Sequence, residues 1–429
     1  MAMSVNIPTT SKPRIVIIGG GFAGMELAKG LRSLEAQVVL LDKNNYHTFQ
    51  PLLYQVATAA LEADSIAYPF REIFKNQNNF IFRMTEVTKI RPEDHCIETS
   101  IGEINYEFLV IAVGSKTNYF GMKDIEQYSL PMKSIPQAMA LRNMILENFE
   151  KALLMGNLED RERLMNIVVV GGGPTGVEMA GSLGELKLHV LPHDYPELDF
   201  QRMQIHLIDM ESRLLNAMSV EASASAEKFL KKYNVNIWLK TKVMSYDGKN
   251  LILSNGKKLI ADGVIWAAGV TGAGVSGLSQ EAMSPGNRIK VDRFNKVVGH
   301  ANIFAIGDVA GMIDEKAPKG YPMLAPVAIQ QAKLLVRNFH RMFTNRPMKS
   351  FDYKELGVMA TVGRNQAVVD LNFIKFQGIL AWFFWLFIHL MTLVGFRNKM
   401  IAFVNWAWSY FSYDKGLRLI IQPFNRKNI

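Results

Sequence analysis

The chain has 429 residues, 49% of them hydrophobic, a size and composition that predict a globular enzyme of two or three domains. Its one cysteine, Cys96, excludes an internal disulfide, a CxxC redox pair and a cysteine-bound metal site or cluster, so redox chemistry would need a bound cofactor. The net charge is +9, but the aromatic residues of the basic C-terminal part lie inside apolar runs, which argues against a nucleic-acid partner.

The N-terminal region carries the first functional motif. The first ten residues contain no basic or apolar leader, so we expect the folded body to stay in the cytoplasm. Residues 14–26, RIVIIGGGFAGME, run from β-branched residues through glycines into helical periodicity. The spacing Gly19-x-Gly21-x-x-Gly24 is typical of a strand, turn and helix that bind the pyrophosphate of a dinucleotide at the helix N-terminus. The turn also includes Phe22 and Ala23.

Two more predicted strands follow this turn. Residues 37–42, QVVLLD, end in Asp42, and Lys43 comes next. A carboxylate about 20 residues after the glycines would bind the ribose hydroxyls, although an acid at a strand end is also an ordinary turn former. The buried strand within residues 107–115 closes on Ala112 and Gly114.

A second glycine motif repeats the first. Residues 166–178, NIVVVGGGPTGVE, have the spacing Gly171-x-Gly173-x-x-Gly176, with Pro174 and Thr175 between the last two glycines. A strand ending in Asp209 follows, after an insertion that contains Leu186 to Phe200. An acid here favours a ribose 2′-hydroxyl and so NADH over NADPH. The strand before Ala268 and Gly269 echoes the one before Gly114.

Two dinucleotide sites in one chain suggest an electron relay. Residues 302–310, NIFAIGDVA, place Asp308 after a strand, where its carboxylate could accept hydrogen bonds from the ribityl chain of a flavin, and we assign the first site to FAD on this basis. A Gly-Asp turn is also common without a ligand. The expected fold is α/β with two Rossmann-like domains and C-terminal amphipathic anchor helices. Its parts are an FAD-binding domain (1–118 and 288–360), a helical connector (119–162), an NADH-binding domain (163–287) and a membrane-anchoring region (361–429).

Together these residues resemble the two-dinucleotide-binding-domain, glutathione-reductase-like flavoproteins. Residues 45–58, NYHTFQPLLYQVAT, residues 112–121 and the Trp-rich ending are similar to type II NADH:quinone oxidoreductases, from about Lys12 to about Ile421. This resemblance implies bound FAD, NADH as co-substrate and a membrane quinone, ubiquinone or menaquinone, as acceptor. It further implies homodimers that are monotopic on the cytoplasmic side of the inner membrane, without proton pumping.

The family's quinone-site pattern, AQxAxQ, is altered in this chain. It falls on residues 325–330, APVAIQ, where Pro326 replaces the first glutamine. Quinone contacts of that first glutamine therefore do not carry over, because proline has neither a side-chain amide nor an N–H. By resemblance we assign Gln330 to FAD, to catalysis and to quinone, and the following Gln331 to quinone. Lys375 is a quinone candidate because it lies at the head of the predicted anchor. Gln330 could also be a helix-surface residue, and Lys375 could bind lipid phosphate.

Hydride transfer from nicotinamide to flavin needs orientation and exclusion of water rather than a nucleophile. By resemblance Glu178 lies near the flavin–nicotinamide contact and is the second catalytic candidate. The alternative is an acid stabilised by the positive end of its helix. Quinone reduction takes up two protons, and the candidate donors are Glu178, water bound to Gln330 and His389. His389 lies in an apolar run that we expect to face lipid, and a structural role is the favoured alternative for it.

The C-terminal segment predicts how the chain meets a lipid-soluble acceptor. Residues 376–396 contain no charged side chain and would extend about 31 Å as one helix, enough to cross a bilayer. The following apolar run, 400–411, is too short to return as an ordinary span. Trp and Tyr with flanking cations favour two helices lying in one leaflet. Beyond Thr361 eight basic residues (Arg364, Lys375, Arg397, Lys399, Lys415, Arg418, Arg426, Lys427) outnumber Asp370 and Asp414.

Three other functions use a similar fold. Sulfide:quinone oxidoreductase requires paired cysteines beside the flavin, which Cys96 alone does not supply. A ferredoxin or rubredoxin reductase would use both cofactors with a soluble acceptor, and would not need the aromatic ending. A membrane-bound flavin-containing redox sensor would bind NADH without useful turnover, and the sequence leaves that alternative open.

Overall fold

The computed structural model describes residues 5–412 and 418–421. Four charged residues of the predicted anchoring region fall outside this part: Asp414, Lys415, Arg426 and Lys427. The chain divides into two compact units, each built from three separate segments. Unit 1 comprises Met1–His47, Tyr68–Lys116 and Val270–Glu355, and unit 2 comprises Thr48–Ala67, Thr117–Gly269 and Leu356–Ile429. The ligand-binding domain limits drawn from the sequence stay a prediction.

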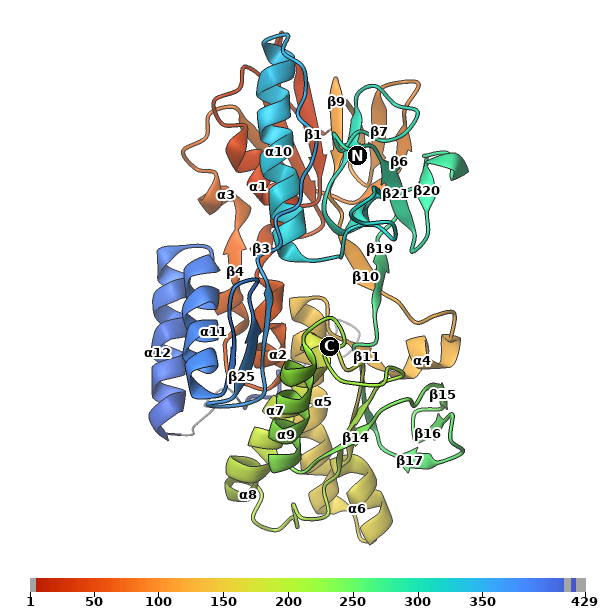
Figure 1. Cartoon of the computed structure of the whole chain (residues 1–429), viewed down its shortest axis with the longest axis vertical. Coiled ribbons are helices and arrows are strands. Elements are labelled where there is room, and N and C mark those ends of the chain that lie inside the picture. Colours follow the sequence, from red (N-terminus) through yellow and green to blue (C-terminus); the bar gives the residue numbers. More distant parts are fainter. Residues whose placement is uncertain (1–4, 413–417, 422–429) are drawn as a thin grey trace, which may run out of the picture. The chain divides into compact units, whose positions relative to one another are not determined.

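Unit 1 is built on a five-stranded parallel sheet with the order β22-β9-β1-β2-β5. Strands β1 and β9 of this sheet are labelled in Figure 1. Its strands are β1 (Arg14–Ile18), β2 (Gln37–Asp42), β5 (Phe80–Met84), β9 (Phe108–Ile111) and β22 (Ile303–Ala305). Helices α1 (Phe22–Gly30) and α10 (Ala325–Phe343) pack together so closely that a Cβ at Gly30 would lie 2.3 Å from Val336. The predicted order of strand, glycine turn, helix and strand is confirmed.

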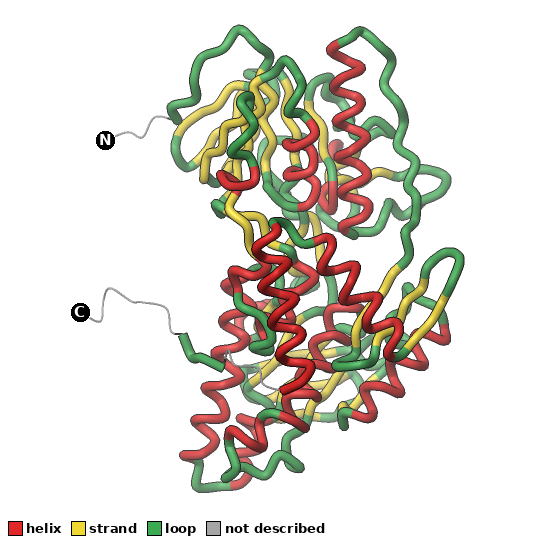
Figure 2. The backbone as a smooth tube through the Cα atoms, turned by 90° about the vertical axis from the view of Figure 1, so that its left-hand side faces the viewer, coloured by secondary structure: helices red, strands yellow, loops and turns green. Residues whose placement is uncertain are grey.

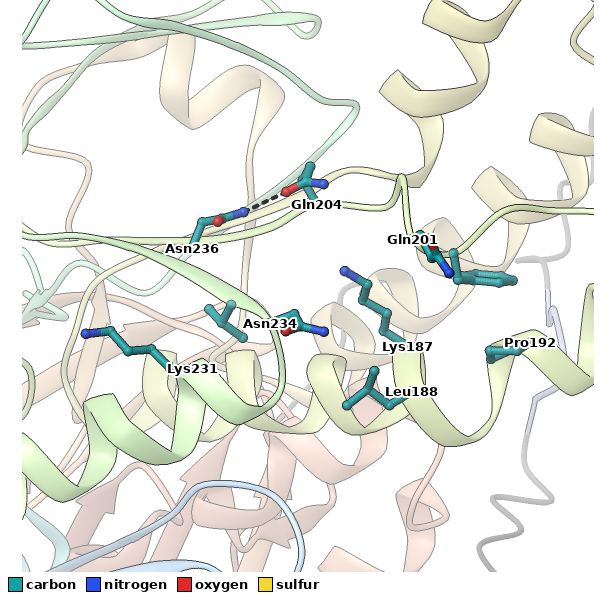
Figure 3. Close-up of a pocket in the computed structure, with 10 residues that line it drawn as sticks. Lys187, Leu188, Pro192, Gln201, Gln204, Lys231, Asn234 and Asn236 are labelled. Atoms are coloured by element: carbon teal, nitrogen blue, oxygen red, sulfur yellow. Dashed lines mark hydrogen bonds between the residues drawn. The ribbon is translucent and has the colours of Figure 1, made fainter.

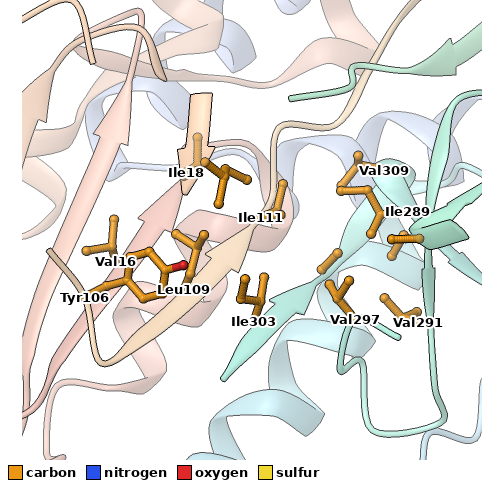
Figure 4. Packing of buried hydrophobic residues seen from close by; sticks show 14 of the residues in the cluster. Val16, Ile18, Tyr106, Leu109, Ile111, Ile289, Val291, Val297, Ile303 and Val309 are labelled. Atoms are coloured by element: carbon orange, nitrogen blue, oxygen red, sulfur yellow. The ribbon is translucent and has the colours of Figure 1, made fainter. Parts of the chain in front are cut away.

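The core of unit 1 explains why its strands read as continuous apolar runs. Val16, Ile18, Leu109 and Ile111 pack with Ile289 and other buried residues of the smaller sheets (Figure 4). Those sheets are β6 (Val87–Arg91), β7 (Cys96–Thr99) and β8 (Gly102–Asn105), and β20 (Met283–Ser284), β21 (Arg288–Val291) and β23 (Ala310–Met312). Every residue of β1 after the first is buried, as expected for a parallel strand covered on both faces.

Unit 2 contains a second parallel sheet, with the order β11-β18-β12-β13-β14. Its strands are β11 (Leu130–Pro131), β12 (Ile167–Val170), β13 (Ile205–Ile208), β14 (Val235–Trp238) and β18 (Gly263–Trp266). The same unit contains the helices α5 (Ile135–Leu154), α6 (Leu158–Met165), α7 (Pro174–His189), α8 (Leu191–Asp194) and α9 (Val220–Lys232). Helix α5 lies within the segment predicted as a helical connector; it starts at the side-chain cap Ser134 and buries Leu141, Ile145 and Phe149.

The C-terminal part of unit 2 differs from the single long helix that the apolar run allows. Strands β24 (Val358–Thr361), β25 (Ala367–Asp370) and β26 (Lys375–Gln377) form an antiparallel sheet. Gly378, with a φ of 86°, then starts α11 (Ile379–Thr392). The 14 residues of α11 extend only about 21 Å. Within the described residues, no helix combines the length and apolarity needed to cross a membrane.

Helix α12 (Phe396–Ser412) follows α11, and the two lie side by side in Figures 1 and 2. One face of α12 is attached to the segment 53–67. The buried Asn398 side chain donates to the carbonyl oxygens of Asp64 (3.0 Å) and Ala67 (2.8 Å). The indole N–H of Trp406 donates to Oε1 of Gln55 at 2.7 Å. These contacts make α12 an integral part of unit 2.

The remaining elements are short. Unit 1 also contains α3 (Phe70–Ile73), η3 (Gln280–Ala282) and η4 (Gly307–Val309). Unit 2 also contains η1 (Gln50–Leu52), α2 (Leu53–Ala57), η2 (Ala63–Ile66), α4 (Lys123–Tyr128), β15 (Val243–Tyr246), β16 (Asn250–Leu253) and β17 (Lys258–Ile260). The chain passes between the units near β3 (Tyr46–Thr48), β4 (Ala67–Pro69), β10 (Ser115–Thr117) and β19 (Val270–Gly272).

Candidate functional site

The first glycine turn lies at the carboxyl edge of the unit 1 sheet, between β1 and α1. Gly19 has a φ of +100°, and a Cβ there would lie 2.5 Å from the carbonyl oxygen of Ala112. A Cβ at Gly24 would lie 1.8 Å from the carbonyl oxygen of Gly19. Gly21 is exposed and has no described atom within 4 Å of its Cβ position. The turn is therefore tight on the protein side and open at Gly21, which fits a pyrophosphate at the N-terminus of α1.

Asp42 stabilises this turn from the end of β2. Its Oδ2 accepts a hydrogen bond from the Gly20 N–H at 2.6 Å, and its Oδ1 accepts one from the Asn44 N–H at 2.8 Å. Burial raises the pKa of the Asp42 carboxyl, and these two N–H groups oppose that rise. The neighbouring Lys43 is exposed and forms an ion pair with Glu86 at 2.6 Å. In this structure Lys43 is directed to Glu86 rather than to the glycine turn.

His47 also supports the first turn, and the sequence analysis did not single it out. Its Nδ1 lies 3.0 Å from the carbonyl oxygen of Gly20, and its ring packs edge-to-face on Phe22 at 5.2 Å between centroids. Burial lowers the pKa of His47 to about 4, so the ring is neutral at pH 7 and Nδ1 carries the proton. Its Nε2 is buried with no partner among the described residues. The only sequence signal for His47 is its position within the segment 45–58 that carries the family resemblance.

Two more strand ends reach the same edge of the unit 1 sheet. Ala112 and Gly114 follow β9, and Asp308 follows β22 in the short helix η4. The Ser115 hydroxyl donates to Oδ2 of Asp308 at 2.6 Å. Because all these residues follow the carboxyl ends of adjacent parallel strands, they surround the place where a doubly wound sheet binds its dinucleotide.

Gln330 and Gln331, adjacent in α10, are directed to different partners. The buried Gln331 accepts from the Gly307 N–H at 2.7 Å through Oε1, and its Nε2 has no partner among the described residues. The amide of Gln330 forms two hydrogen bonds with the backbone of Lys354, at 2.8 and 3.0 Å. Pro326 occupies the first turn of α10, where its missing N–H breaks no helical hydrogen bond. Gln331 is thus the better placed to reach a ligand beside Gly307.

The second glycine turn, in unit 2, repeats the geometry of the first. Gly171 has a φ of +117°, and a Cβ there would lie 2.4 Å from the carbonyl oxygen of Ala267. A Cβ at Gly176 would lie 1.8 Å from the carbonyl oxygen of Gly171. Gly173 has no described atom within 4 Å of its Cβ position. The first two residues of α7, Pro174 and Thr175, are exposed at this opening.

Asp209 has the same relation to the second turn as Asp42 has to the first. Its Oδ2 accepts from the Gly172 N–H, and its Oδ1 accepts from the Glu211 N–H at 2.7 Å. Ala268 and Gly269 follow β18 at the same edge of the sheet. The predicted dinucleotide residues of unit 2 are therefore gathered around one turn, as they are in unit 1.

Glu178 lies in the second turn of α7, within a buried polar cluster. Burial raises the pKa of its carboxyl to about 8, against weaker opposing effects of the Thr361 N–H, 3.5 Å away, and the Trp385 indole. The Tyr54 hydroxyl lies 3.0 Å from Oγ1 of Thr361 and accepts from Nε2 of Gln55 at 3.0 Å. Burial, and then the nearby Glu178 charge, raise the pKa of Tyr54. At pH 7 both groups hold their protons.

A cavity of about 70 Å³ adjoins this cluster. Its lining comes from α2, α7, the segment after β24, α11 and α12, and includes Tyr54, Gln55, Ser182, Glu185, Thr361, Arg364, Trp382, Trp385, Trp406 and Tyr410. The wall contributed by α11 and α12 is mainly aromatic. A flat, mostly apolar ring with polar edge atoms matches such a lining.

The geometry bears on two candidate residues of the C-terminal region, His389 and Lys375. His389 stacks on Trp385, with centroids 3.8 Å apart, and lies edge-to-face with Phe49. The prediction that His389 faces lipid was wrong, because α11 turns this side chain inward, and burial lowers its pKa to about 4. Lys375 is exposed in β26 and does not line the aromatic cavity.

A larger cavity, of about 540 Å³, lies elsewhere in unit 2 (Figure 3). It is lined by residues at the N-terminal ends of β13 and β14, opposite the edge that carries Gly173. Lys187 and Lys231 line it from the last turns of α7 and α9, where cations complement the negative helix ends. Nζ of Lys187 donates to the carbonyl oxygen of Met203 at 2.7 Å. This cavity is not the dinucleotide site.

Comparison with known proteins agrees with this geometry. The family model described as pyridine nucleotide-disulphide oxidoreductase matches residues 13–332, and the NDH2 C-terminal domain matches residues 356–412. Type II NADH:quinone oxidoreductase Ndh of Mycobacterium tuberculosis is 32% identical over 427 residues, 95% of this chain and 91% of that protein. The type II NADH:quinone oxidoreductase of Haemophilus influenzae is 31% identical, covering 83% and 87% of the two chains.

A solved structure confirms the fold. NDH2 from Plasmodium falciparum, in complex with NADH, superimposes with a TM-score of 0.87 at 22% identity, covering 96% of this chain and all of that one. The chain therefore belongs to the type II NADH:quinone oxidoreductases, flavoproteins with FAD as cofactor and NADH as co-substrate.

Proposed function

We propose that this chain oxidises NADH and delivers two electrons through FAD to a membrane quinone, as a non-proton-pumping respiratory dehydrogenase. When bound, FAD accepts hydride from NADH and passes the electrons on. The observation that carries the proposal is the pair of equivalent glycine turns, each at the carboxyl edge of its own parallel sheet, in a chain that also carries an aromatic cavity beside two exposed apolar helices.

We assign FAD to unit 1. The pyrophosphate would bind at the opening beside Gly21, and Asp42 would keep the turn in place while binding ribose. Asp308 would accept hydrogen bonds from the flavin side chain, and the unpartnered Nε2 of Gln331 would donate to the cofactor. For Gln330, a contact with flavin or quinone would require release of its two bonds to Lys354. We therefore place the assignment on Gln331 first.

We assign NADH to unit 2, at the opening beside Gly173. Asp209 would bind the adenosine ribose hydroxyls, which favours NADH over NADPH. The exposed Thr175, with the N-terminus of α7, would bind the pyrophosphate. Ala268 and Gly269 would line the same site from the end of β18.

We infer that the quinone ring binds in the aromatic cavity of unit 2. Tyr54 lines this cavity, and Glu178 belongs to the buried polar cluster that adjoins it. Both groups hold protons at pH 7 because burial raises their pKa values. Quinone reduction consumes two protons, and Glu178, with a pKa near 8, can release one close to neutral pH. Tyr54, linked to Thr361 and Gln55, would orient the ring rather than supply the first proton.

We propose that α11 and α12 bind the membrane as a monotopic anchor. Several of their apolar side chains are strongly exposed, including Leu380 (73%), Phe383 (49%) and Phe387 (59%) on α11. Exposed residues on α12 include Met400, Phe403, Val404, Trp408 and Phe411. An apolar surface of this kind flanked by Arg397 and Lys399 fits the interface of an anionic bilayer. From the resemblance we further propose a homodimer on the cytoplasmic side of the inner membrane.

Anaerobic stopped-flow absorbance tests the reaction. NADH should bleach the flavin of the purified protein, and ubiquinone or menaquinone should restore its absorbance on the timescale of turnover. Ferredoxin and rubredoxin serve as alternative acceptors in separate mixes. Rapid reoxidation by one of these proteins but not by quinone would favour the soluble reductase, and bleaching without reoxidation by any acceptor would favour a redox sensor.

Vesicle binding tests the anchor. The triple variant Leu380→Ser, Phe383→Ser and Phe387→Ser removes three exposed side chains, each worth about 1.5 to 3 kcal/mol when fully buried. We expect its partitioning onto phosphatidylglycerol vesicles to fall at least a hundredfold, with NADH oxidation by ferricyanide retained. The control is Leu154→Ser, which replaces an 81% exposed leucine of α5. Equal binding by the triple variant and wild type would contradict the anchor.

A further inference from the structure

Glu185 and Arg364 form a buried ion pair in unit 2 that belongs to neither dinucleotide turn. Nε of Arg364 lies 3.7 Å from Oε1 of Glu185, and the two side chains are 8% and 10% exposed. Glu185 lies two turns after Glu178 on α7, so both carboxyl groups project from the same face of that helix. Arg364 belongs to the turn between β24 and β25. The pair therefore connects α7 to the C-terminal sheet.

Arg364 also holds the end of the anchor helix α12. Its two terminal nitrogens donate to the carbonyl oxygens of Ser409 and Tyr410, the latter at 3.1 Å. Both carbonyl oxygens belong to the last four described residues of α12. The guanidinium lies 5.6 Å from the centroid of the Tyr410 ring. A planar group with five donors can satisfy Glu185 and both carbonyls together, whereas an ammonium cannot reproduce this geometry.

The loop that carries Arg364 has little freedom to move. A Cβ at Gly363 would lie 2.6 Å from the Tyr233 hydroxyl, and a Cβ at Gly181 of α7 would lie 2.8 Å from the backbone nitrogen of Gly363. This close packing fixes the distance between α7 and the loop. Glu185, Arg364 and Tyr410 all line the aromatic cavity. The pair therefore fixes the position of the cavity wall formed by α12 relative to the wall formed by α7.

We propose that the Glu185–Arg364 pair is a positioning device that fixes the C-terminal turn of α12 on α7 and so shapes the quinone cavity. This inference rests on the proposed function, because it takes the aromatic cavity as the quinone site. The two residues act through Tyr410 and the cavity wall, and contact neither dinucleotide turn. Their loss should therefore impair quinone binding while the reduction of flavin by NADH continues.

The test compares two acceptors with the full-length protein in phosphatidylglycerol vesicles. NADH oxidation is followed with ferricyanide and with a short-chain water-soluble quinone, and KM and kcat are determined for each. For Arg364→Met we expect the quinone KM to rise at least tenfold, with ferricyanide turnover and the NADH KM within twofold of wild type. Arg364→Lys, which keeps the charge but not the paired carbonyl bonds, should give a rise of about threefold.

A double-mutant cycle shows whether the two residues act together. Glu185→Gln alone should raise the quinone KM severalfold, and the double variant Glu185→Gln/Arg364→Met should rise by less than the product of the single changes. Lys231→Met, which breaks the exposed Glu227–Lys231 pair on α9, is the control and should change neither acceptor. If Arg364→Met fails to fold, Arg364→Lys and Glu185→Gln test the inference in the same way, by a higher quinone KM with unchanged ferricyanide turnover.

Two outcomes would overturn the inference. One is a folded set of variants whose quinone KM stays within twofold of wild type. The other is a parallel loss with quinone and ferricyanide, which would mean that the pair only stabilises the fold. Failure of the wild-type protein to reduce quinone at all would instead refute the proposed function, so the two failures are distinguishable.

Discussion

Replacing Glu178 by Gln should stabilise the protein at neutral and alkaline pH. Burial raises the pKa of Glu178 from 4.5 to about 8. Below pH 4.5 the group is protonated in the folded and the unfolded chain, and it imposes no penalty. Between pH 4.5 and 8 only the unfolded chain ionises, so the free energy of unfolding falls by about 1.4 kcal/mol per pH unit. The accumulated penalty is about 3 kcal/mol at pH 7, reaches about 5 kcal/mol near pH 8 and stays constant above that pH.

Glutamine removes this penalty while keeping an acceptor for the Thr361 N–H. An unfolding entropy of about 2.1 cal/mol/K per residue makes 1 kcal/mol equivalent to roughly 1 °C in a chain of this length. We therefore expect Glu178→Gln to raise Tm by about 3 °C at pH 7, by more at pH 8.5 and by little at pH 5. Thermal unfolding with saturating FAD, followed by circular dichroism across this pH range, measures the difference between variant and wild type.

Glu35→Gln is the matched control, since its side chain is 81% exposed and its ion pair with Lys12 lies at the surface, so we expect Tm to change little. A gain for Glu178→Gln that is the same at pH 5 and pH 8.5 would show that the carboxyl does not titrate between these values in the fold. A loss of stability that grows with pH would refute the reasoning outright, because it would mean that the folded protein favours the ionised form.

Three further predictions concern activity and packing. If Glu178 supplies a proton, wild-type quinone reduction should decline as pH rises through about 8, and Glu178→Gln should be slow and lack this step in its pH–rate profile. Asp209→Asn should raise the NADH KM roughly 10- to 100-fold, because a charged hydrogen bond is lost, and should leave the flavin-to-protein ratio unchanged. Asp42→Asn should instead lower the flavin-to-protein ratio. Loss of flavin in Asp209→Asn would contradict our assignment of the two sites. Gly181→Ala should lower stability by about 1 to 3 kcal/mol in denaturant unfolding, because its Cβ would meet the loop after β24 at 2.8 Å, whereas Gly156→Ala, with no described atom within 4 Å, should not.

The two dinucleotide-binding turns could be predicted from the sequence because the contacts that shape them involve residues close together in the chain. A positive φ at Gly19 and at Gly171, and the absence of room for a Cβ at the third glycine of each motif, are imposed by residues of the motif itself and by one adjacent strand. The acid at the end of the next strand follows from the same parallel pairing. The hydrogen bonds that Asp42 and Asp209 accept from the N–H groups of Gly20 and Gly172 were not predicted, since no side-chain pattern reveals which backbone N–H a carboxylate will bind.

The C-terminal region shows where local patterns were insufficient. By hydropathy, residues 376–396 form one apolar run. In the structure Gly378 divides this run into the end of strand β26 and a helix of 14 residues. His389 has an apolar sequence context and still stacks on Trp385, because the packing of α11 on the sheet β24–β26 and on α12 decides which side of the helix is inward. The altered AQxAxQ pattern likewise did not reveal that Gln331, rather than Gln330, is directed at Gly307.

The sequence by itself determined the two dinucleotide-binding turns, their acidic partners and the family, since each depends on residues close together in the chain or on motifs of fixed spacing. Only the tertiary structure decided the cluster of Glu178, Tyr54 and Thr361, the pairing of Glu185 with Arg364, and the inward face of α11. The reason is physical: the pKa of a carboxyl and the partner of a guanidinium depend on which distant segments exclude water around them, and that packing has no local pattern in the sequence.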